Sequence, residues 1–423
     1  MAAPILSPFD AAAVLLVTAA VLGYLNRRFL PFSAAVGLTF MGALASLIVV
    51  ALDAILPGTH LSATLGAFLR GVNFSSTLLN GMLSYLLFAG ALHIDWRELS
   101  RGRWPILVLS TVSTVASTGL VGIGFYAVSS AMGLGVSLSW AFVFGALISP
   151  TDPVAVFAVL KTLTLPERLK ATLAAESLFN DGIAVVLFGI ALAFAASGAP
   201  IDPGEALWAF VRQAGGGVAL GGVVGGLGYL FMRDIDDYNV EVMITLAVVT
   251  GGYALAHLVD VSGPVAMAVA GLVIGNAAVG HAMSAATRDY LLKFWAVIDN
   301  VLNAVLFLLI GLEFVAVVHD GHLLLAGVAA IPVVLLARLV SVAPPLLALP
   351  GIEADRLTLT TLVWGGLRGG LSVAMALAIG AAAPGRVILA ATYVVVLFAV
   401  LVQGGTIEMA IRRLAGSRPG AGR

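Results

Sequence analysis

The sequence contains no cysteine and few charged residues. Without cysteine the chain has no disulfides, no thiolate metal sites and no cysteine nucleophile. Only 10% of its 423 residues are charged, whereas an ordinary soluble domain has about 25%. Its histidines lie at or near predicted loops, and none has the spacing of metal ligands. The composition excludes an ordinary soluble domain.

Hydrophobic residues make up 61% of the chain. A helix of about 20 apolar residues crosses a hydrocarbon core of roughly 30 Å. Such stretches recur at residues 8–25, 33–55, 74–93, 104–130, 137–160, 169–196, 205–232, 240–259, 262–280, 293–318, 322–349, 355–381 and 387–411. We therefore predict an all-α polytopic membrane protein with about 13 transmembrane helices.

The basic residues of the predicted loops are unevenly distributed. If the N-terminus lies outside, alternate loops place most Lys and Arg residues in the cytoplasm, and only Arg70, Arg212 and Arg386 fall outside. This asymmetry agrees with the positive-inside rule. The sequence predicts a multi-pass protein of the cell membrane with its N-terminus outside and its C-terminus in the cytoplasm.

Five charged residues fall inside the apolar stretches: Asp152, Glu176, Asp181, Arg338 and Arg368. A charge at the centre of a bilayer costs about 2.5 to 3.5 kcal/mol, so such residues usually face the protein interior or a water-filled path. A structural ion pair can explain one of them, but not all five. Four other carboxyl groups are expected nearer the membrane interface: Glu241, Asp299, Glu313 and Glu408.

Two of the predicted helices contain breaking residues near their middle. The stretch GALISPTDPVAVFAVL has prolines at positions 150 and 153 around Asp152. Each proline lacks an amide hydrogen and disfavours helix in the residue before it, which leaves carbonyl groups free. Seven segments later, VWGGLRGGLSVAMAL places two glycine pairs around Leu367 and Arg368, and glycine weakens a helix.

An offset of seven segments gives the two interrupted helices opposite orientations in the membrane. This pattern predicts inverted repeats with two crossed discontinuous helices, an arrangement in which secondary transporters bind ions near the midplane. The ends of half-helices carry partial charges, positive at N-termini and negative at C-termini. Asp152 and Arg368 have the signs that compensate these two kinds of end.

The helix predicted over 169–196 carries two polar faces. Ser177 and Asp181 are four residues apart and share one face. Together with carbonyl groups freed near Thr151, this face offers the oxygen ligands that hard cations prefer. We therefore expect a monovalent metal ion at Asp181, Ser177 and Thr151.

Glu176 and Asn180 share the adjacent face, and Asn180 is expected beside the cation and proton site. A buried Glu176 carboxylate needs a cationic partner, and we choose Arg368, with Arg338 as a further core charge. If all five deep charges are ionised, one negative charge is left over. One cation or one proton neutralises it, so the two compete, and the charge count predicts one-for-one exchange.

Several motifs spread over essentially the whole chain carry a family resemblance. They are SPTDPVAV at 149–156, ESLFNDGIAVVLF at 176–188, FW at 294, NAVLFLLIGLE at 303, GGLRGGLSVAMAL at 365 and VQGGT at 402. Together they resemble the sodium/proton antiporters of the electroneutral branch, the bacterial NhaP and animal NHE exchangers. The resemblance implies an antiporter that exchanges a monovalent cation for a proton by alternating access.

The same resemblance implies ion ligation by Asp181, Ser177, the Thr151 carbonyl and Asp152, and a homodimer in the lipid bilayer. It implies scaffold helices in residues 1–98 and 199–320, and a core in residues 99–198 and 321–423 that ends in a short tail. Asn180 matches the residue that distinguishes this branch from electrogenic relatives with two adjacent aspartates. One departure is Ala89, where some relatives carry a carboxylate, which puts an assisted proton route there in doubt.

Several alternatives stay open at this point. A potassium-preferring or electrogenic antiporter is one, because sodium, lithium and potassium all accept oxygen shells. An intramembrane aspartyl protease would use Asp152 and Asp181 as a catalytic dyad, but no GxGD element is present. A channel would give single-channel currents rather than saturable, counter-ion-dependent flux. We expect no cofactor and no nucleic-acid partner.

Overall fold

A computed structural model of the protein describes residues 8–415 except 31, 57, 73, 153–165, 199–201, 279–282, 317–320, 350–354, 381 and 382. The described part is helical and has no β-strand. Its α-helices are α1 (Pro8–Phe29), α2 (Ala34–Ile55), α3 (Leu61–Val72), α4 (Phe74–Thr77), α5 (Leu83–Leu92), α6 (Trp96–Arg101), α7 (Arg103–Leu107), α8 (Ser113–Ala131), α9 (Leu138–Ile148), α11 (Glu167–Ser197), α12 (Pro203–Phe210), α13 (Gly216–Arg233), α14 (Tyr238–Leu258), α15 (Gly263–Val273), α17 (Ala285–Leu312), α18 (Gly321–Ala348), α19 (Arg356–Trp364), α20 (Gly370–Ala378), α21 (Ala383–Leu397) and α22 (Gly404–Ala415). Short π-helical turns connect or extend some of them at η1 (Leu78–Met82), η2 (Val108–Val112), η3 (Val211–Gly215), η4 (Ile274–Ala278) and η6 (Phe398–Gln403), and η5 (Glu313–Ala316) is a 3-10 turn.

These helices overlap all the predicted apolar segments. Within the described residues, nine helices are long and apolar enough to cross a membrane, and shorter apolar helices occur at Leu83–Leu92, Leu138–Ile148 and Gly263–Ala277. The prediction of an all-α, multi-pass membrane protein is confirmed. The second half of the segment expected at 137–160 lies outside the described residues. The short helix α3 was not predicted, because its stretch is too short to count as a spanning segment.

Polar residues fix where several helices begin. A carboxylate oxygen of Asp355 accepts a 2.7 Å hydrogen bond from the amide of Thr358 at the start of α19. Asp237 does the same for the amide of Asn239 at the start of α14, at 2.9 Å. These caps satisfy amides that the first turn of a helix leaves free. The long helix α11 ends at Ser197 and is followed by Gly198, whose left-handed conformation (φ 68°) suits glycine.

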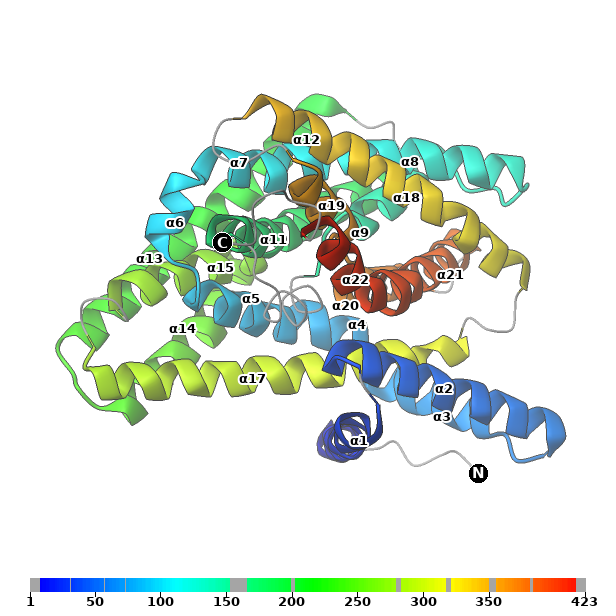
Figure 1. The fold of residues 1–423 in the computed structure, drawn as a ribbon, viewed down its shortest axis with the longest axis horizontal. Coiled ribbons are helices and arrows are strands. Elements are labelled where there is room, and N and C mark those ends of the chain that lie inside the picture. Colours follow the sequence, from blue (N-terminus) through cyan, green and yellow to red (C-terminus); the bar gives the residue numbers. More distant parts are fainter. Residues whose placement is uncertain are drawn as a thin grey trace.

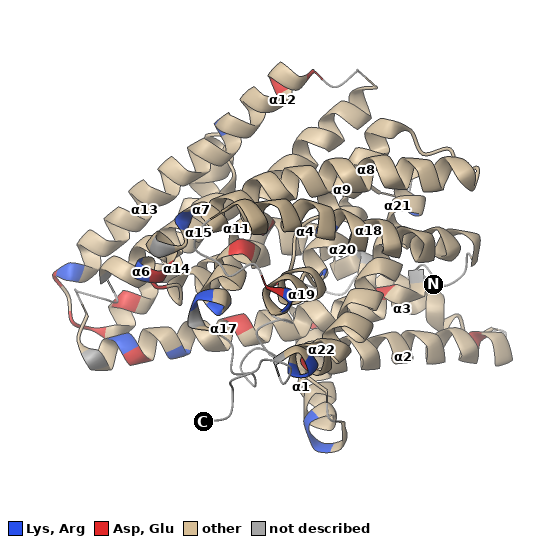
Figure 2. Cartoon of the chain, turned by 45° about the horizontal axis from the view of Figure 1, so that its top comes forward, with Lys and Arg blue, Asp and Glu red and all other residues tan. Residues whose placement is uncertain are grey.

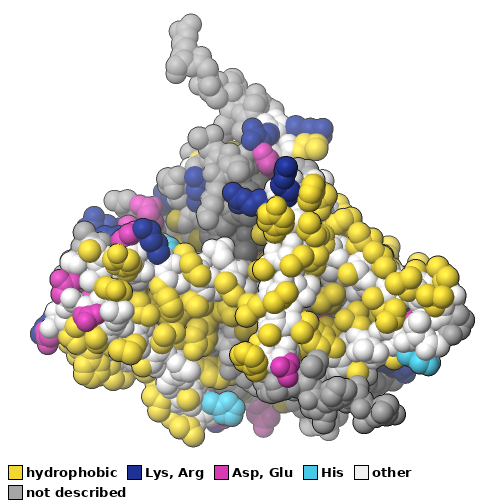
Figure 3. All heavy atoms as spheres, turned by 90° about the horizontal axis from the view of Figure 1, so that it is seen from below, with side chains coloured by type: hydrophobic (Ala, Val, Ile, Leu, Met, Phe, Trp, Pro, Cys, Tyr) yellow, Lys and Arg dark blue, Asp and Glu magenta, His cyan; other side chains and the backbone are white. Residues whose placement is uncertain are grey.

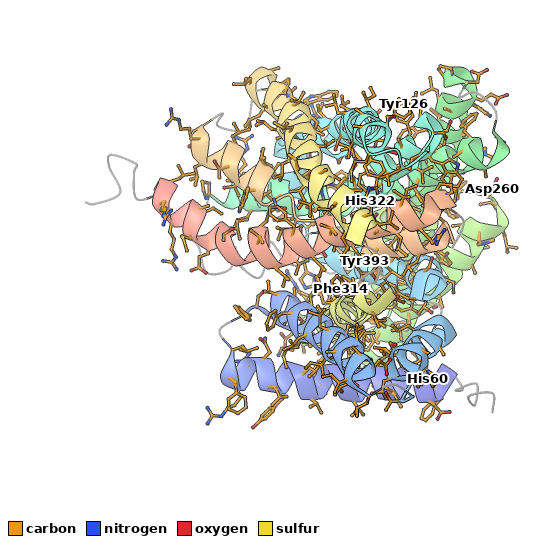
Figure 4. All side chains as sticks on the ribbon, turned by 90° about the vertical axis from the view of Figure 1, so that its right-hand side faces the viewer. His60, Tyr126, Asp260, Phe314, His322 and Tyr393 are labelled. Carbon is orange, nitrogen blue, oxygen red and sulfur yellow. The ribbon has the colours of Figure 1, made fainter. Side chains whose placement is uncertain are left out.

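The helices that carry the deep charges lie in the middle of the molecule. Figure 1 shows α9, α11, α19 and α20 near its centre, with α13, α14 and α15 on one side and α1, α2 and α3 on the other. α17 runs along one edge between these two outer groups. In the side view of Figure 4, α1 and α2 form an outer layer, and His60 lies in the turn between α2 and α3.

The outer surface is largely apolar. Figure 3 shows hydrophobic side chains over much of one face, with charged side chains gathered toward its edges. In Figure 2 most of the ribbon is uncharged, and charged residues lie mainly toward helix ends and connections. Large apolar side chains such as Phe231 and Leu258 are exposed. Such a surface is suited to contact with lipid hydrocarbon.

Candidate functional site

The two predicted helix interruptions contact one another. One follows α9, and the other separates α19 from α20 at residues 365–369. The backbone amide of Asp152 in the first interruption donates a 2.8 Å hydrogen bond to the carbonyl of Leu367 in the second. The crossing is therefore direct, backbone to backbone. Any helix that follows Asp152 lies outside the described residues.

Two buried arginines bind the carbonyl groups at the ends of these half-helices. Arg368 donates from Nη1 to the carbonyl of Ser149 and, at 2.8 Å, to that of Pro150, just beyond α9. Arg338 donates from Nε and Nη2 to the carbonyl of Leu362 in the last turn of α19, at 3.2 and 3.1 Å. Each guanidinium places positive charge at the negative end of a half-helix, where carbonyls lack intrahelical partners.

The structure gives Glu176 a different partner from the expected Arg368. Nη1 and Nη2 of Arg338 donate to the two carboxylate oxygens of Glu176 at 2.8 and 3.0 Å. The two side chains are 4% and 0% exposed. Arg368 lies within the interruption itself, so its nearest acceptors are the freed carbonyls of the other interruption. Arg338 on α18 is the residue that reaches α11 and the end of α19 together.

Asn180 connects this ion pair to the first interruption. Its Nδ2 donates to Oε1 of Glu176 at 3.0 Å and to the hydroxyl of Thr151 at 2.8 Å. Its Oδ1 accepts from the amide of Thr151 at 3.3 Å. The hydroxyl of Thr151 also lies 3.0 Å from the hydroxyl of Ser177. Four of the predicted residues thus form one buried hydrogen-bonded cluster.

Asp181 and Asp152 line a cavity at the crossing. The space in this cavity that the centres of water molecules can occupy has a volume of about 110 Å³. Asp181 is only 8% exposed, and no described residue donates a hydrogen bond to its carboxylate. Asp152 packs so closely against Gly369 that a Cβ atom at that position would collide with its carboxylate. Asp152 is thereby held beside the N-terminus of α20, the positive end of that half-helix.

Comparisons with known proteins give the family of this chain. A profile of the family described as sodium/hydrogen exchanger, transmembrane, matches residues 14–413. The chain is 42% identical over 416 residues to the Na(+)/H(+) antiporter NhaP of Pseudomonas aeruginosa, an alignment that covers 97% of this chain and 98% of that protein. The chain belongs to the sodium/hydrogen exchanger family.

A second relative and a solved structure extend the comparison. The exchanger chain is 34% identical over 351 residues to the Na(+)/H(+) antiporter ApNhaP of Aphanothece halophytica, covering 82% of this chain and 66% of that protein. The structure of the sodium proton antiporter MjNhaP1 from Methanocaldococcus jannaschii at pH 8 matches with a TM-score of 0.76 at 19% identity, covering 97% and 99% of the two chains. That match shows a shared fold. Membership of a family of transporters does not favour the protease alternative.

The exchanger cavity contains residues that the sequence did not single out. Asp299 and Asn303 line it from α17, although Asp299 was expected near the membrane interface. The helix begins at Ala285 rather than near residue 293, so Asp299 lies deeper along it than expected. The sequence feature that could have indicated these two residues is their four-residue spacing, which places Asp299 and Asn303 on one face of a helix. Ala89 of α5 is buried in an apolar cluster and is not among the residues that line the cavity.

The oxygen groups of this site suit a singly charged cation. No cluster of three or more His, Asp or Glu side chains placed to hold a metal ion occurs in the described part of the chain. Asp181 and Asp152 line the cavity, whereas the hydroxyls of Thr151 and Ser177 bind each other within the adjacent cluster. One or two carboxylates with neutral oxygens match a monovalent ion better than a divalent one.

Proposed function

We propose that this exchanger moves one sodium ion against one proton by alternating access, with Asp181 as the group that carries either ion. The observation that carries the proposal is the buried Asp181 carboxylate, which lines the cavity at the crossing and receives no hydrogen bond from the described residues. The names of the relatives, Na(+)/H(+) antiporters, support sodium as the cation. Rates measured across lithium, sodium and potassium test that choice.

The charges around the site support one-for-one exchange. Glu176 and Arg338 neutralise each other in a bidentate pair, and Asp152 and Arg368 cancel in the charge count. Asp181 remains as the spare negative charge. One sodium ion or one proton neutralises it, whereas an empty, charged site at this depth is penalised by about 3 kcal/mol. We infer that only the two loaded forms cross the membrane domain readily.

We further propose that Ser177 and the Thr151 carbonyl complete the sodium shell, that Asp152 contributes through water, and that Asn180 orients Thr151. Ser177→Ala is expected to raise the KM for sodium about tenfold, equivalent to about 1.4 kcal/mol, because the ion loses a neutral ligand. The pH midpoint of exchange at saturating sodium should move little, because no charge is removed. Dye-monitored exchange in proteoliposomes measures both quantities.

The matched control for that variant is Ser197→Ala on the same helix, where an exposed hydroxyl donates to the carbonyl of Phe194. Its KM for sodium should equal that of the unmodified protein. A Ser177→Ala variant with an unchanged KM would remove Ser177 from the proposed cation shell.

Electroneutral exchange is the second expectation. Proteoliposomes with a fixed sodium gradient should exchange protons equally fast with the membrane potential clamped at zero or at about 100 mV, although that potential is worth about 2.3 kcal/mol per net charge moved. A shift of the equilibrium point with potential would mean that a second carboxylate titrates in the cycle. Asp152 would then be the first candidate.

We also propose the division into scaffold (1–98 and 199–320) and core (99–198 and 321–423). One apolar cluster joins α5, α13, α14, α15 and α17, all within the scaffold ranges. The Glu176–Arg338 pair and the bonds from Arg368 to Ser149 and Pro150 join the two core ranges. On this proposal α11 and α20 move together, relative to α17.

A homodimer formed through the scaffold and an N-terminus outside the cell membrane complete the proposal. α1 has exposed apolar side chains, among them Phe9 and Val17. They form a face that can contact lipid or a second copy of this chain. Light scattering of the detergent-solubilised protein, corrected for detergent, measures the number of chains. Cysteine introduced at either terminus of this cysteine-free chain, and labelled by an impermeant reagent, reports which side each terminus occupies.

A further inference from the structure

The cavity beside Asp181 has a polar wall that the proposed exchange does not use. Asp299 and Asn303 form part of it from α17, and Ser372 forms part of it from the first turn of α20. Nδ2 of Asn303 donates to Oδ1 of Asp299 at 2.9 Å. The amide thus orients the carboxylate without neutralising it.

Ser372 carries a second and independent indication of a ligand. Its side chain is 1% exposed, and its Oγ has no hydrogen-bond partner in the described part of the chain. A hydroxyl buried without a partner costs about 1 to 3 kcal/mol. Because this one lies at a cavity wide enough for several waters, a guest in the cavity can satisfy it. A hydroxyl oxygen is also an acceptable neutral ligand for a hard cation.

The charge of the cavity favours a cation as that guest. Asp152, Asp181 and Asp299 all line it, together with apolar residues of α5 such as Leu83 and Leu87. The two arginines of the crossing are directed elsewhere, to Glu176 and to backbone carbonyls. A cleft lined by one sign of charge with low-dielectric walls raises the local concentration of counter-ions.

We propose that Asp299 and Ser372 together hold a monovalent cation in this cavity before it reaches Asp181. This outer cation site rests on the proposed exchange function and adds a second binding position on the path of the cation. Asp299 belongs to the proposed scaffold, and Ser372 belongs to the proposed core with Asp181. Movement of the core would separate the two outer ligands, so the outer site would lose its ion as the core moves. The charge of Asp299 stays with the scaffold and is not added to the charge that crosses.

Three variants test the outer cation site through the KM for sodium, measured as dye-monitored exchange in proteoliposomes. Asp299→Asn keeps the shape and an oxygen acceptor for Asn303, and is expected to raise the KM about tenfold through loss of cation attraction. Ser372→Ala should raise it about threefold through loss of one neutral ligand. The double variant should have a KM no higher than Asp299→Asn alone, because both residues hold the same ion. The maximal rate at saturating sodium should change by less than about twofold.

Two control variants guard against charge and folding effects. Asp289→Asn removes a carboxylate from the same helix, where it pairs with Lys293 at the surface, and should leave the KM unchanged. Asp299→Glu keeps the charge, so it should retain a KM nearer to that of the unmodified protein. If Asp299→Asn does not fold, Ser372→Ala carries the test.

Several outcomes overturn the outer site. They are an unchanged KM in Asp299→Asn, additive effects in the double variant, or effects that disappear when impermeant salt raises the ionic strength, which would indicate long-range attraction only. If Asp181→Asn abolishes exchange while the KM of Asp299→Asn is unchanged, the exchange function stands and the outer site falls. If the unmodified protein shows no sodium-dependent proton flux, both fall.

Discussion

Asp181→Asn is expected to abolish exchange while leaving the protein folded. The amide keeps the shape of the side chain, but at neutral pH it neither binds a proton nor supplies a negative charge. In the unmodified protein, a penalty of about 3 kcal/mol on the empty, charged site couples ion loading to movement. The variant lacks this penalty, so we expect its exchange rate to fall at least about 100-fold. Proteoliposomes with a trapped pH-sensitive dye give this rate directly.

Asp260→Asn is the matched control for this substitution. Asp260 is exposed, pairs with Arg212, and has a left-handed backbone conformation that asparagine also tolerates. Exchange by this variant should match that of the unmodified protein. Near-normal exchange by Asp181→Asn would instead move the carrier role to another carboxylate.

Breaking the Glu176–Arg338 pair is expected to have the largest effect on stability. Glu176→Gln or Arg338→Gln alone leaves one buried charge without a partner, so each should lower the free energy of unfolding by roughly 3 to 5 kcal/mol. The double variant should lose less than the sum, because the two residues are in contact. Unfolding in mixed micelles, followed by circular dichroism, measures each value.

An exposed pair provides the comparison. Glu408 and Arg412 pair four residues apart on α22, with side chains 43% and 62% exposed. Glu408→Gln should therefore lower the free energy of unfolding by less than about 1 kcal/mol. If the losses of Glu176→Gln and Arg338→Gln simply add in the double variant, the two residues are not coupled as the structure indicates.

The features that the sequence predicted correctly depend on residues close together in the chain. The interruptions follow from prolines at 150 and 153 and from two glycine pairs around Arg368, and each can be read in a short window. The positions and order of the apolar segments follow from hydropathy, which needs no tertiary information.

The features that the sequence did not predict correctly depend on contacts between distant segments. Glu176 could pair with Arg338 or Arg368, and only the packing of α18 against the end of α19 decides between them. Asp299 was misplaced because helix boundaries read from a sequence are imprecise, and the early start of α17 moves it inward. Ser372 gave no signal, since a serine in an apolar helix usually bonds to its own backbone.

The release of protons by sodium tests the central claim most directly. The detergent-solubilised protein, starting from the protonated form in weakly buffered solution, is mixed with sodium chloride, and a pH indicator counts the protons released. The unmodified exchanger should release about one proton for each sodium ion bound, and Asp181→Asn should release none, because cation and proton compete for that carboxylate. Sodium binding without proton release, or an unchanged release in Asp181→Asn, would contradict the assignment of Asp181 as the shared carrier.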